Sequence, residues 1–221
     1  MNHLLLSSVG RKRLWRLSLG VCGLSLTLGL WPVSAAEKDL LERFFSDVQT
    51  LRADFQQTVL DEELSPIRQS EGQFWLSRPG RFRWSYGVPL EQVVLADGAR
   101  IWIYDVELEQ VVVRLQESGL SGTPAALLAG GEGPDESYLV EGLGTQGGIS
   151  WIALFPRDSG TPFSQIQLGF EGETLRLVQM LDQLDQVTRL RFDNVVVNEN
   201  VPLEHFTLAL PEGVDVVRED F

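Results

Sequence analysis

Most of the chain alternates apolar and polar residues with a period of two, the pattern of β-strands that bury one face. The alternation recurs in many short segments, namely 55–59, 74–76, 82–86, 93–95, 102–104, 111–113, 138–143, 149–155, 163–170, 174–181 and 187–197. Short links such as Ala96-Asp97-Gly98 separate them and are typical of hairpin turns. After residue 198 we expect a short helical turn and a last strand. The pattern therefore predicts about ten or eleven antiparallel strands.

Two segments break the strand pattern. Residues 37–51 carry apolar side chains, among them Phe44 and Phe45, with a 3.6-residue period that predicts an amphipathic helix. In residues 123–131, a proline follows a threonine and glycines follow an apolar run, which predicts one short helix. Helices this few and short cannot cover one face of a large sheet. A strongly curved sheet with a cavity beneath the helices resolves this shortage, and ordinary burial on both faces is the alternative.

The first residues look like an export signal. Arg11, Lys12, Arg13 and Arg16 precede an uncharged run over 17–30, and small residues follow up to Ala36. We expect residues 1–36 to be a cleaved signal peptide and residues 37–221 to form a single domain in the periplasm. Cys22 lies inside the apolar run after a valine, so we do not expect it to be a lipid-attachment site.

Charge and composition exclude several classes of function. Residues 1–36 contain four Lys or Arg and no Asp or Glu, so the remainder has 14 basic and 31 acidic residues and a net charge of −17. Such a chain is a poor ligand for nucleic acid or for an anionic membrane surface. It contains no cysteine, one histidine (His205) and one lysine (Lys38). Histidine metal sites, Schiff-base lysines and phosphate-loop lysines are thereby excluded, and we expect no catalytic residue, metal or cofactor.

A glycine motif lies in the second half of the chain. Residues 142–147 match G-x-G-x-x-G, which in dinucleotide sites precedes a helix. Here the following residues are strand-like, so we expect a glycine-rich hairpin instead. A pair of carboxylates working as a glycoside hydrolase is not excluded by spacing, although dispersed surface carboxylates explain the acidic residues more simply.

The segment FWLSRPGRFRW, residues 74–84, is the most distinctive stretch. Arg78 precedes a proline, where the chain is extended and a regular strand ladder ends. Its guanidinium offers five donors in a rigid fork and is able to reach several backbone carbonyls at once. An arginine that extends past Trp75 into water is the alternative.

Several motifs together resemble the LolA family of periplasmic outer-membrane lipoprotein carrier proteins. They are LSRPGRFRWSY at 76–86, VVLADGARIWIYDVELEQVVV at 93–113, TPAALLA at 123–129 and ALPEGVDVV at 209–217. The resemblance implies a mainly β fold, an incomplete eleven-stranded antiparallel β-barrel whose open side is covered by short helices that form a lid over an apolar cavity. It also implies that Arg78 holds the lid closed through contacts with helix backbone. Phe45, Leu127 and Leu128 would belong to the lid helices. The aromatic positions near the cavity would be Trp75, Phe82, Trp84, Trp102 and Tyr104.

The resemblance further implies a function and partners. Carriers of this family bind the acyl chains of triacylated lipoproteins that an ABC-type complex releases from the inner membrane, and they deliver them to an outer-membrane lipoprotein receptor. We expect a monomer that binds no nucleic acid. A periplasmic lipid- or lipoprotein-sensing module with the same half-barrel is the alternative function, and a hydrolase that uses cavity carboxylates is a third.

Overall fold

The computed structural model describes residues 35–116, 124–130, 134 and 136–219. The predicted signal peptide, residues 1–36, lies outside these residues except for its last two positions. Ala35 and Ala36 already belong to the first helix, α1 (Ala35–Asp47). Within the described ranges, no helix combines the length and the apolar character needed to cross a membrane.

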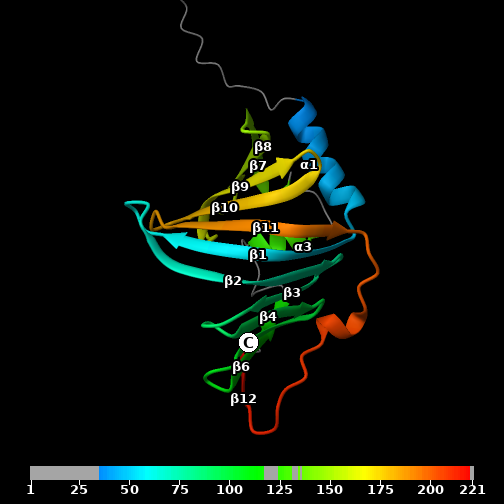
Figure 1. Cartoon of the computed structure of the whole chain (residues 1–221), viewed down its shortest axis with the longest axis vertical. Helices are drawn as coiled ribbons and strands as arrows, with labels where there is room; N and C mark the ends of the chain where they lie inside the picture. The colour runs from blue at the N-terminus through cyan, green and yellow to red at the C-terminus, as the bar shows by residue number, and fades with distance from the viewer. Residues whose placement is uncertain (1–34, 117–123, 131–133, 135, 220–221) are drawn as a thin grey trace, which may run out of the picture. The chain divides into compact units, whose positions relative to one another are not determined.

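The described residues form a single twelve-stranded sheet (Figure 1). The strands before the second helix are β1 (Thr50–Leu60), β2 (Pro66–Ser77), β3 (Arg81–Tyr86), β4 (Gln92–Asp97), β5 (Arg100–Asp105) and β6 (Gln110–Leu115). The strands after it are β7 (Tyr138–Gln146), β8 (Ile149–Pro156), β9 (Phe163–Glu171), β10 (Thr174–Asp182), β11 (Val187–Val197) and β12 (Asp215–Glu219). The second helix is α3 (Pro124–Ala129), and a 3₁₀ turn, η1 (Leu203–Phe206), precedes β12.

The order across the sheet is β12-β6-β5-β4-β3-β2-β1-β11-β10-β9-β8-β7. Every pair of neighbouring strands except β12–β6 is antiparallel, and β1 joins the two halves of the chain by pairing with both β2 and β11. The expected mainly β fold with an incomplete antiparallel sheet is confirmed, since β12 and β7 remain edge strands. The strand count needs one correction, because β12 is a twelfth strand and pairs in parallel with β6.

The helix predicted for residues 37–51 ends earlier than expected. It stops at Asp47, and Leu51 already lies in β1, where it pairs with Leu76 of β2 and Val197 of β11. An apolar residue at position 51 fits both the helical and the strand period, so the pattern alone does not locate the boundary.

One large apolar cluster lies on the inner face of the sheet. It contains Trp84 and Ile101 from one half of the chain and Leu154 and Ile166 from the other. Because residues from distant strands share one core, the sheet curls around it. Helix α1 packs against β7 and β8, and α3 packs against β2 and β3, so both helices cover this inner face.

The glycine motif at 142–147 forms the expected hairpin. It lies at the end of β7 and in the turn to β8, and Gly144 and Gly147 have φ values of 79° and 60°. The chain continues from this turn directly into β8 rather than into a helix, so the predicted hairpin is confirmed.

Candidate functional site

Arg78 follows the last residue of β2 and is 8% exposed. Its Nη1 donates to the carbonyl oxygen of Phe44 at 2.9 Å, to that of Phe45 at 3.4 Å and to that of Val48. Its Nε donates to the carbonyl oxygen of Leu128 at 3.1 Å. A single guanidinium therefore binds the backbone at the ends of both α1 and α3.

The helices need such a partner at these ends. The last four carbonyl groups of a helix have no partner within the helix, and the negative end of the helix dipole lies there. Helix α1 ends at Asp47 and carries no basic residue in its last turn. Arg78 supplies the missing cation from a neighbouring strand, and it acts as a C-terminal cap that two helices share.

The environment of Arg78 keeps the guanidinium buried but charged. Its Cζ atom lies 4.9 Å from the ring centroids of both Phe44 and Phe45, within cation–π range. Burial lowers the pKa of Arg78 to about 10, which leaves it protonated at neutral pH. Among the described residues no carboxylate forms an ion pair with it. Carbonyl dipoles and aromatic faces therefore compensate its charge.

The other end of α1 is fixed by a carboxylate. Glu37 is buried, and its Oε1 accepts a hydrogen bond from the backbone N–H of Gly144 at 2.8 Å. A Cβ atom at Gly142 would lie 2.0 Å from Oε2 of Glu37. The glycines of β7 thus let α1 approach the sheet closely, so α1 is attached at both ends.

The turn after Arg78 makes a second contact with α3. The N–H of Gly80 donates to the carbonyl oxygen of Ala129 at 2.9 Å. The side chain of Gln116 holds the turn in place, because its Nε2 donates to the Gly80 carbonyl at 2.8 Å and its Oε1 accepts from the Gly98 N–H at 3.2 Å. Gly80 has a φ of 73°, which favours glycine at this position.

Five of the predicted site residues lie in the same apolar cluster beneath the guanidinium. All are buried: Phe45, Phe82, Trp84, Leu127 and Leu128. Their assignment to a lid and a lipid cavity stays a prediction, and so does the cavity itself.

The other three predicted aromatic residues lie on the outer face of the sheet. Trp75 stacks on His205 of η1, with ring centroids 4.4 Å apart. Trp102 and Tyr104 belong to a second, smaller cluster under the C-terminal segment, together with Val111 and Val113. The prediction that they lie at the inner cavity is therefore wrong.

Strand alternation explains the error. In β2 Phe74 and Leu76 point into the core, so Trp75 between them points away from it. In β5 Ile101 and Ile103 face the core, and Trp102 is directed to the outer face. The size of an aromatic side chain indicates burial but not which face is buried.

Some residues at the site were not predicted. Phe44 contacts the Arg78 guanidinium with its ring and accepts a hydrogen bond from it with its carbonyl oxygen. Its place in the apolar stripe of the predicted helix indicated that it would be buried. Phe55, Phe74 and Phe192 complete an aromatic shell around Trp84. Gln116 carried no sequence signal, because its role depends on the turn that folds against it.

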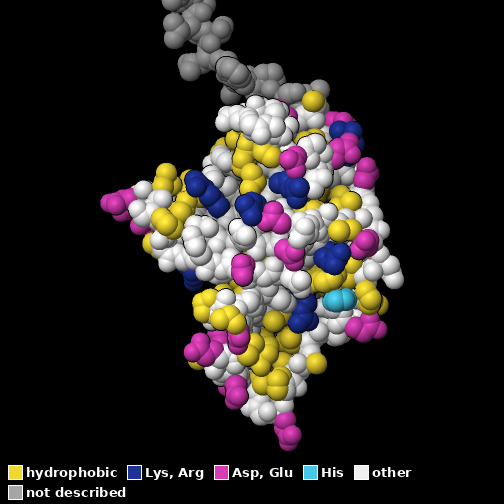
Figure 2. Space-filling view, viewed as in Figure 1, with side chains coloured by type: hydrophobic (Ala, Val, Ile, Leu, Met, Phe, Trp, Pro, Cys, Tyr) yellow, Lys and Arg dark blue, Asp and Glu magenta, His cyan; other side chains and the backbone are white. Residues whose placement is uncertain are grey.

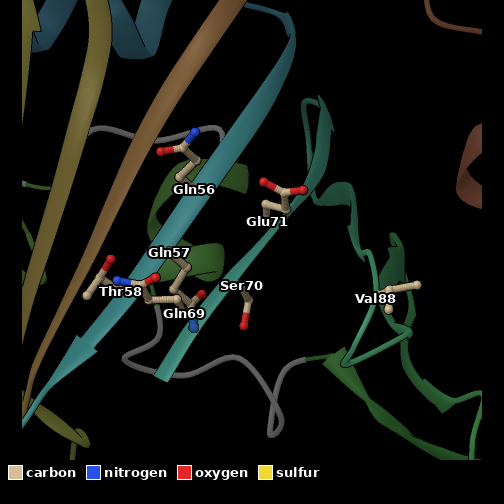
Figure 3. A pocket seen from close by; sticks show the side chains of 7 residues that line it. All are labelled: Gln56, Gln57, Thr58, Gln69, Ser70, Glu71 and Val88. Carbon is tan, nitrogen blue, oxygen red and sulfur yellow. The ribbon is translucent and has the colours of Figure 1, made fainter. Parts of the chain in front are cut away.

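A separate, polar pocket of about 360 Å³ lies beside the C-terminal half of β1 and the N-terminal half of β2 (Figure 3). Its lining is rich in amide and hydroxyl groups: Gln56, Gln57, Thr58, Gln69, Ser70, Glu71 and Val88. Oε1 of Gln57 accepts a hydrogen bond from the Tyr86 hydroxyl at 3.0 Å. Tyr86 packs against the apolar cluster, so this hydrogen bond marks where that cluster gives way to polar groups.

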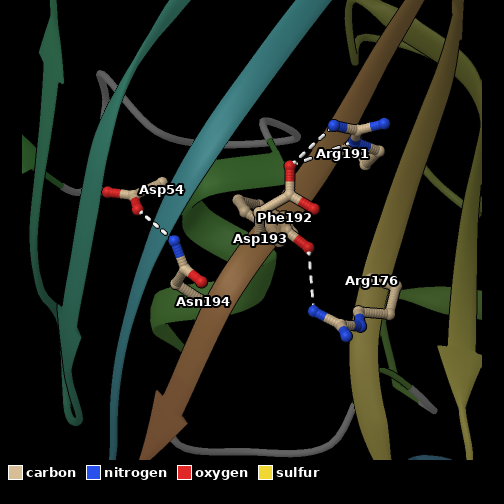
Figure 4. Close-up of polar contacts among 6 residues, drawn as sticks. All are labelled: Asp54, Arg176, Arg191, Phe192, Asp193 and Asn194. Atoms are coloured by element: carbon tan, nitrogen blue, oxygen red, sulfur yellow. Dashed lines mark hydrogen bonds and ion pairs between the residues drawn. The ribbon is translucent and has the colours of Figure 1, made fainter.

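Acidic and basic side chains alternate on the outer face (Figure 2). Over β10 and β11, Arg191 pairs with Asp193 at 2.9 Å, and Nη1 of Arg176 donates to the carbonyl oxygen of Phe192 (Figure 4). Nδ2 of Asn194 donates to Asp54 of β1 at 2.8 Å. An exposed ion pair such as Arg191–Asp193 contributes little stability.

The chain is similar to known proteins over most of its length. The family model of the outer membrane lipoprotein carrier protein LolA matches residues 46–209. A relative from Nitrosospira multiformis, named outer-membrane lipoprotein carrier protein, is 39% identical over 180 residues, which cover 81% of this chain and 87% of the relative. One of the same name from Nitrosomonas europaea is 37% identical and covers 93% of this chain and 98% of its own.

Among solved structures, an uncharacterized conserved protein from Thermus thermophilus has a similar fold. The TM-score is 0.53 at 13% identity, with 83% of this chain and 98% of that chain covered. This likeness concerns the fold alone. The family match and the identity of the carrier proteins go further, and they show that the chain belongs to the LolA family of outer-membrane lipoprotein carrier proteins.

Proposed function

We propose that this protein is a periplasmic chaperone that binds the acyl chains of lipoproteins and carries them to the outer membrane. Family membership and the names of the relatives support this function. The donor would be an ABC-type release complex in the inner membrane, and the acceptor an outer-membrane lipoprotein receptor. The protein would act as a monomer after removal of residues 1–36.

The observation that carries the proposal is the shared cap on the two helices. Arg78 binds carbonyl oxygens of Phe44 and Leu128, and both helices cover the apolar face of the sheet. The helices thereby form a lid held by polar bonds over an apolar interior. Such a lid is able to open when the gain from burying cargo exceeds the loss of these bonds.

The magnitudes suit reversible binding. One acyl chain of roughly 15 methylenes represents about 12 kcal/mol of apolar transfer. Hydrogen bonds to a charged group contribute about 1.5–3 kcal/mol each, and several of them join Arg78 to the helices. Opening therefore costs a sizeable part of what one chain gains, which weakens net binding and favours release. No catalytic step is required of this chain.

Replacing Arg78 by leucine tests this mechanism. Without the bonds that favour the closed, empty lid, Arg78→Leu should retain cargo and fail to pass it to receptor-containing vesicles. We expect transfer to fall by about tenfold or more, since the bonds lost exceed roughly 1.4 kcal/mol. The measurement is mass spectrometry of the periplasmic protein, which reveals any stoichiometric lipoprotein, followed by a transfer assay.

Arg81→Leu is the matched control. Arg81 begins β3 directly after the turn that follows Arg78, but its Nε donates to the carbonyl oxygen of Asp97 rather than to a helix. This variant should transfer cargo like the wild type. Normal transfer by Arg78→Leu would refute the lid mechanism, and a wild-type protein that binds lipoprotein without ever transferring it would favour a sensor.

A further inference from the structure

The indole of Trp84 contains an unsatisfied hydrogen-bond donor. The side chain is 6% exposed and lies in the apolar cluster beneath the lid. Its Nε1 is buried and has no hydrogen-bond partner among the residues that the structure describes. Buried tryptophan N–H groups usually find an acceptor, because leaving one unpaired is unfavourable.

The surroundings explain why no acceptor is available. Rings surround Trp84, with centroids at 4.6 Å for Phe74, 5.2 Å for Phe55, 6.3 Å for Phe192 and 6.5 Å for Tyr86. The hydroxyl of Tyr86 is directed to Gln57, to which it donates. Packing in this cluster therefore provides apolar contacts but no carbonyl or carboxylate for the indole.

Trp102 of the same sheet shows the ordinary outcome. On the outer face, its Nε1 donates to Oδ2 of Asp97 at 2.9 Å. A tryptophan with a structural role thus has its acceptor within the protein, and the unpaired donor lies on the face that the lid covers. Nη2 of Arg78 is a second buried donor on this face without a partner among the described residues.

We propose that Trp84 anchors the cargo by donating its Nε1–H to a carbonyl oxygen of an acyl ester. This inference rests on the proposed carrier function. Hydrocarbon chains offer no acceptor, and the ester carbonyls that join two of the chains to glycerol lie directly beside them. An indole in an apolar wall both packs against methylene groups and binds such a carbonyl. Trp84 would therefore recognise the ester-bearing part of a diacylglyceryl group.

Two lipid probes isolate this hydrogen bond. One is a cysteine peptide that carries a dipalmitoylglyceryl group, and the other is its dialkyl ether twin, which lacks the ester carbonyls. Affinities for both are measured on the mature protein and on a variant in which Trp84 is replaced by benzothienylalanine, an isostere without the N–H. The change in the ester-to-ether ratio between the proteins reports the interaction.

We expect the mature protein to prefer the ester probe by about three- to tenfold, as one hydrogen bond predicts. The preference should disappear in the Trp84 variant and persist when the same isostere replaces Trp102. An unchanged ratio in the Trp84 variant overturns the inference while the carrier function stands. If neither probe binds the wild type, the carrier function itself fails.

A second measurement needs no variant. In ¹⁵N-resolved spectra, the indole N–H resonance of Trp84 should move downfield with the ester probe and much less with the ether. The Trp102 resonance should stay in place with both, because its proton is already bonded to Asp97. Equal movement of the Trp84 resonance with both probes contradicts the proposal.

Discussion

Strands β2 and β3 are covered on both faces, and an arginine attaches the cover on each side. On the inner face, Arg78 binds carbonyl oxygens of α1 and α3, that of Phe44 at 2.9 Å. On the outer face, Nη1 of Arg83 donates to carbonyl oxygens of His205 and Thr207, at 3.5 and 3.4 Å. The same chemical group thus performs the same task twice.

The two attachments differ in their environment. Arg78 is buried between two aromatic rings and caps helix ends. Arg83 is partly buried, and its partners lie around the single turn of η1. Burial lowers the pKa of both arginines. Hydrogen bonds strengthen where water is excluded, so the inner cover is held by the stronger contacts.

Under the proposed function the inner cover opens and the outer cover stays in place, and the two differ in how they are attached. The outer segment also has β12, whose backbone pairs with β6 along five residues. Helices α1 and α3 have no such ladder, and side-chain contacts and isolated backbone bonds hold them. We therefore expect that removing a few polar bonds frees the inner cover, whereas the outer segment remains attached to the sheet through β12.

The largest expected effect follows from Arg78→Ala. Losing the charged cap should lower the free energy of opening of α1 by about 2–3 kcal/mol, which accelerates amide exchange in that helix about 30- to 150-fold. Hydrogen exchange with mass spectrometry measures this. Amides of η1 and β12 should exchange as in the wild type. Equal acceleration in both covers would mean that the variant unfolds globally, and the comparison would be lost.

Gln116→Ala should have the next largest effect. It removes the bonds that hold the Gly80 turn, so the Gly80 N–H should lose protection as its bond to Ala129 weakens. We expect a change of about 1–2 kcal/mol, the range for one or two neutral hydrogen bonds. Gln110→Ala is the control, because the Gln110 side chain makes a long, 3.5 Å contact with Asp215, away from this turn. Similar results for the two variants would exclude a role of Gln116 in the lid.

Much of this arrangement followed from the sequence. Period-two alternation placed β11 at residues 187–197, as observed, because strand faces are set locally by the side chains. The five donors of Arg78 before a proline predicted that it could bind several backbone carbonyls, with an arginine extended into water as the alternative. That these carbonyls belong to helices was implied only by the resemblance to the LolA family, and the structure shows these contacts. Local patterns thus specified the elements and the principal polar group.

Other features depend on tertiary contacts that no local pattern encodes. Trp75 points to the outer face because its neighbours Phe74 and Leu76 pack into the core. The role of Gln116 arises only when the β4–β5 hairpin and the β2–β3 turn meet at Gly98 and Gly80. Parallel pairing of β12 likewise depends on where the chain returns after η1.

Arg83→Ala sharpens the comparison from the other side. It removes long, partly hydrated bonds, so the outer segment should open more easily by less than about 1 kcal/mol. Exchange of the Thr207 amide, which donates to the carbonyl of Glu204, is the measurement. Helix α1 should not respond. A loss as large as that of Arg78→Ala would show that burial does not distinguish the two arginines.

The smallest expected effect is a loss of stability of the β4–β5 hairpin at low pH. Burial alone raises the pKa of Asp97, but hydrogen bonds from the Trp102 indole and from the N–H groups of Arg100 and Ala99 outweigh it, and the pKa lies below its ordinary 3.8. A depressed carboxyl pKa gives stability that is present above the unfolded-state value and lost as pH falls through the folded-state value.

The hairpin beneath the outer cover should therefore weaken below about pH 3.8, by less than roughly 1 kcal/mol, the net value of an ordinary hydrogen bond. Asp97→Asn removes the titrating group and should abolish this part of the pH dependence. Urea unfolding at a series of pH values, followed by the ¹⁵N-resolved indole resonance of Trp102, measures it. Because Arg78 has no carboxylate partner among the described residues, the difference in α1 exchange between the wild type and Arg78→Ala should be the same above and below this pH, and a difference that shrinks in acid would show that the two covers are coupled.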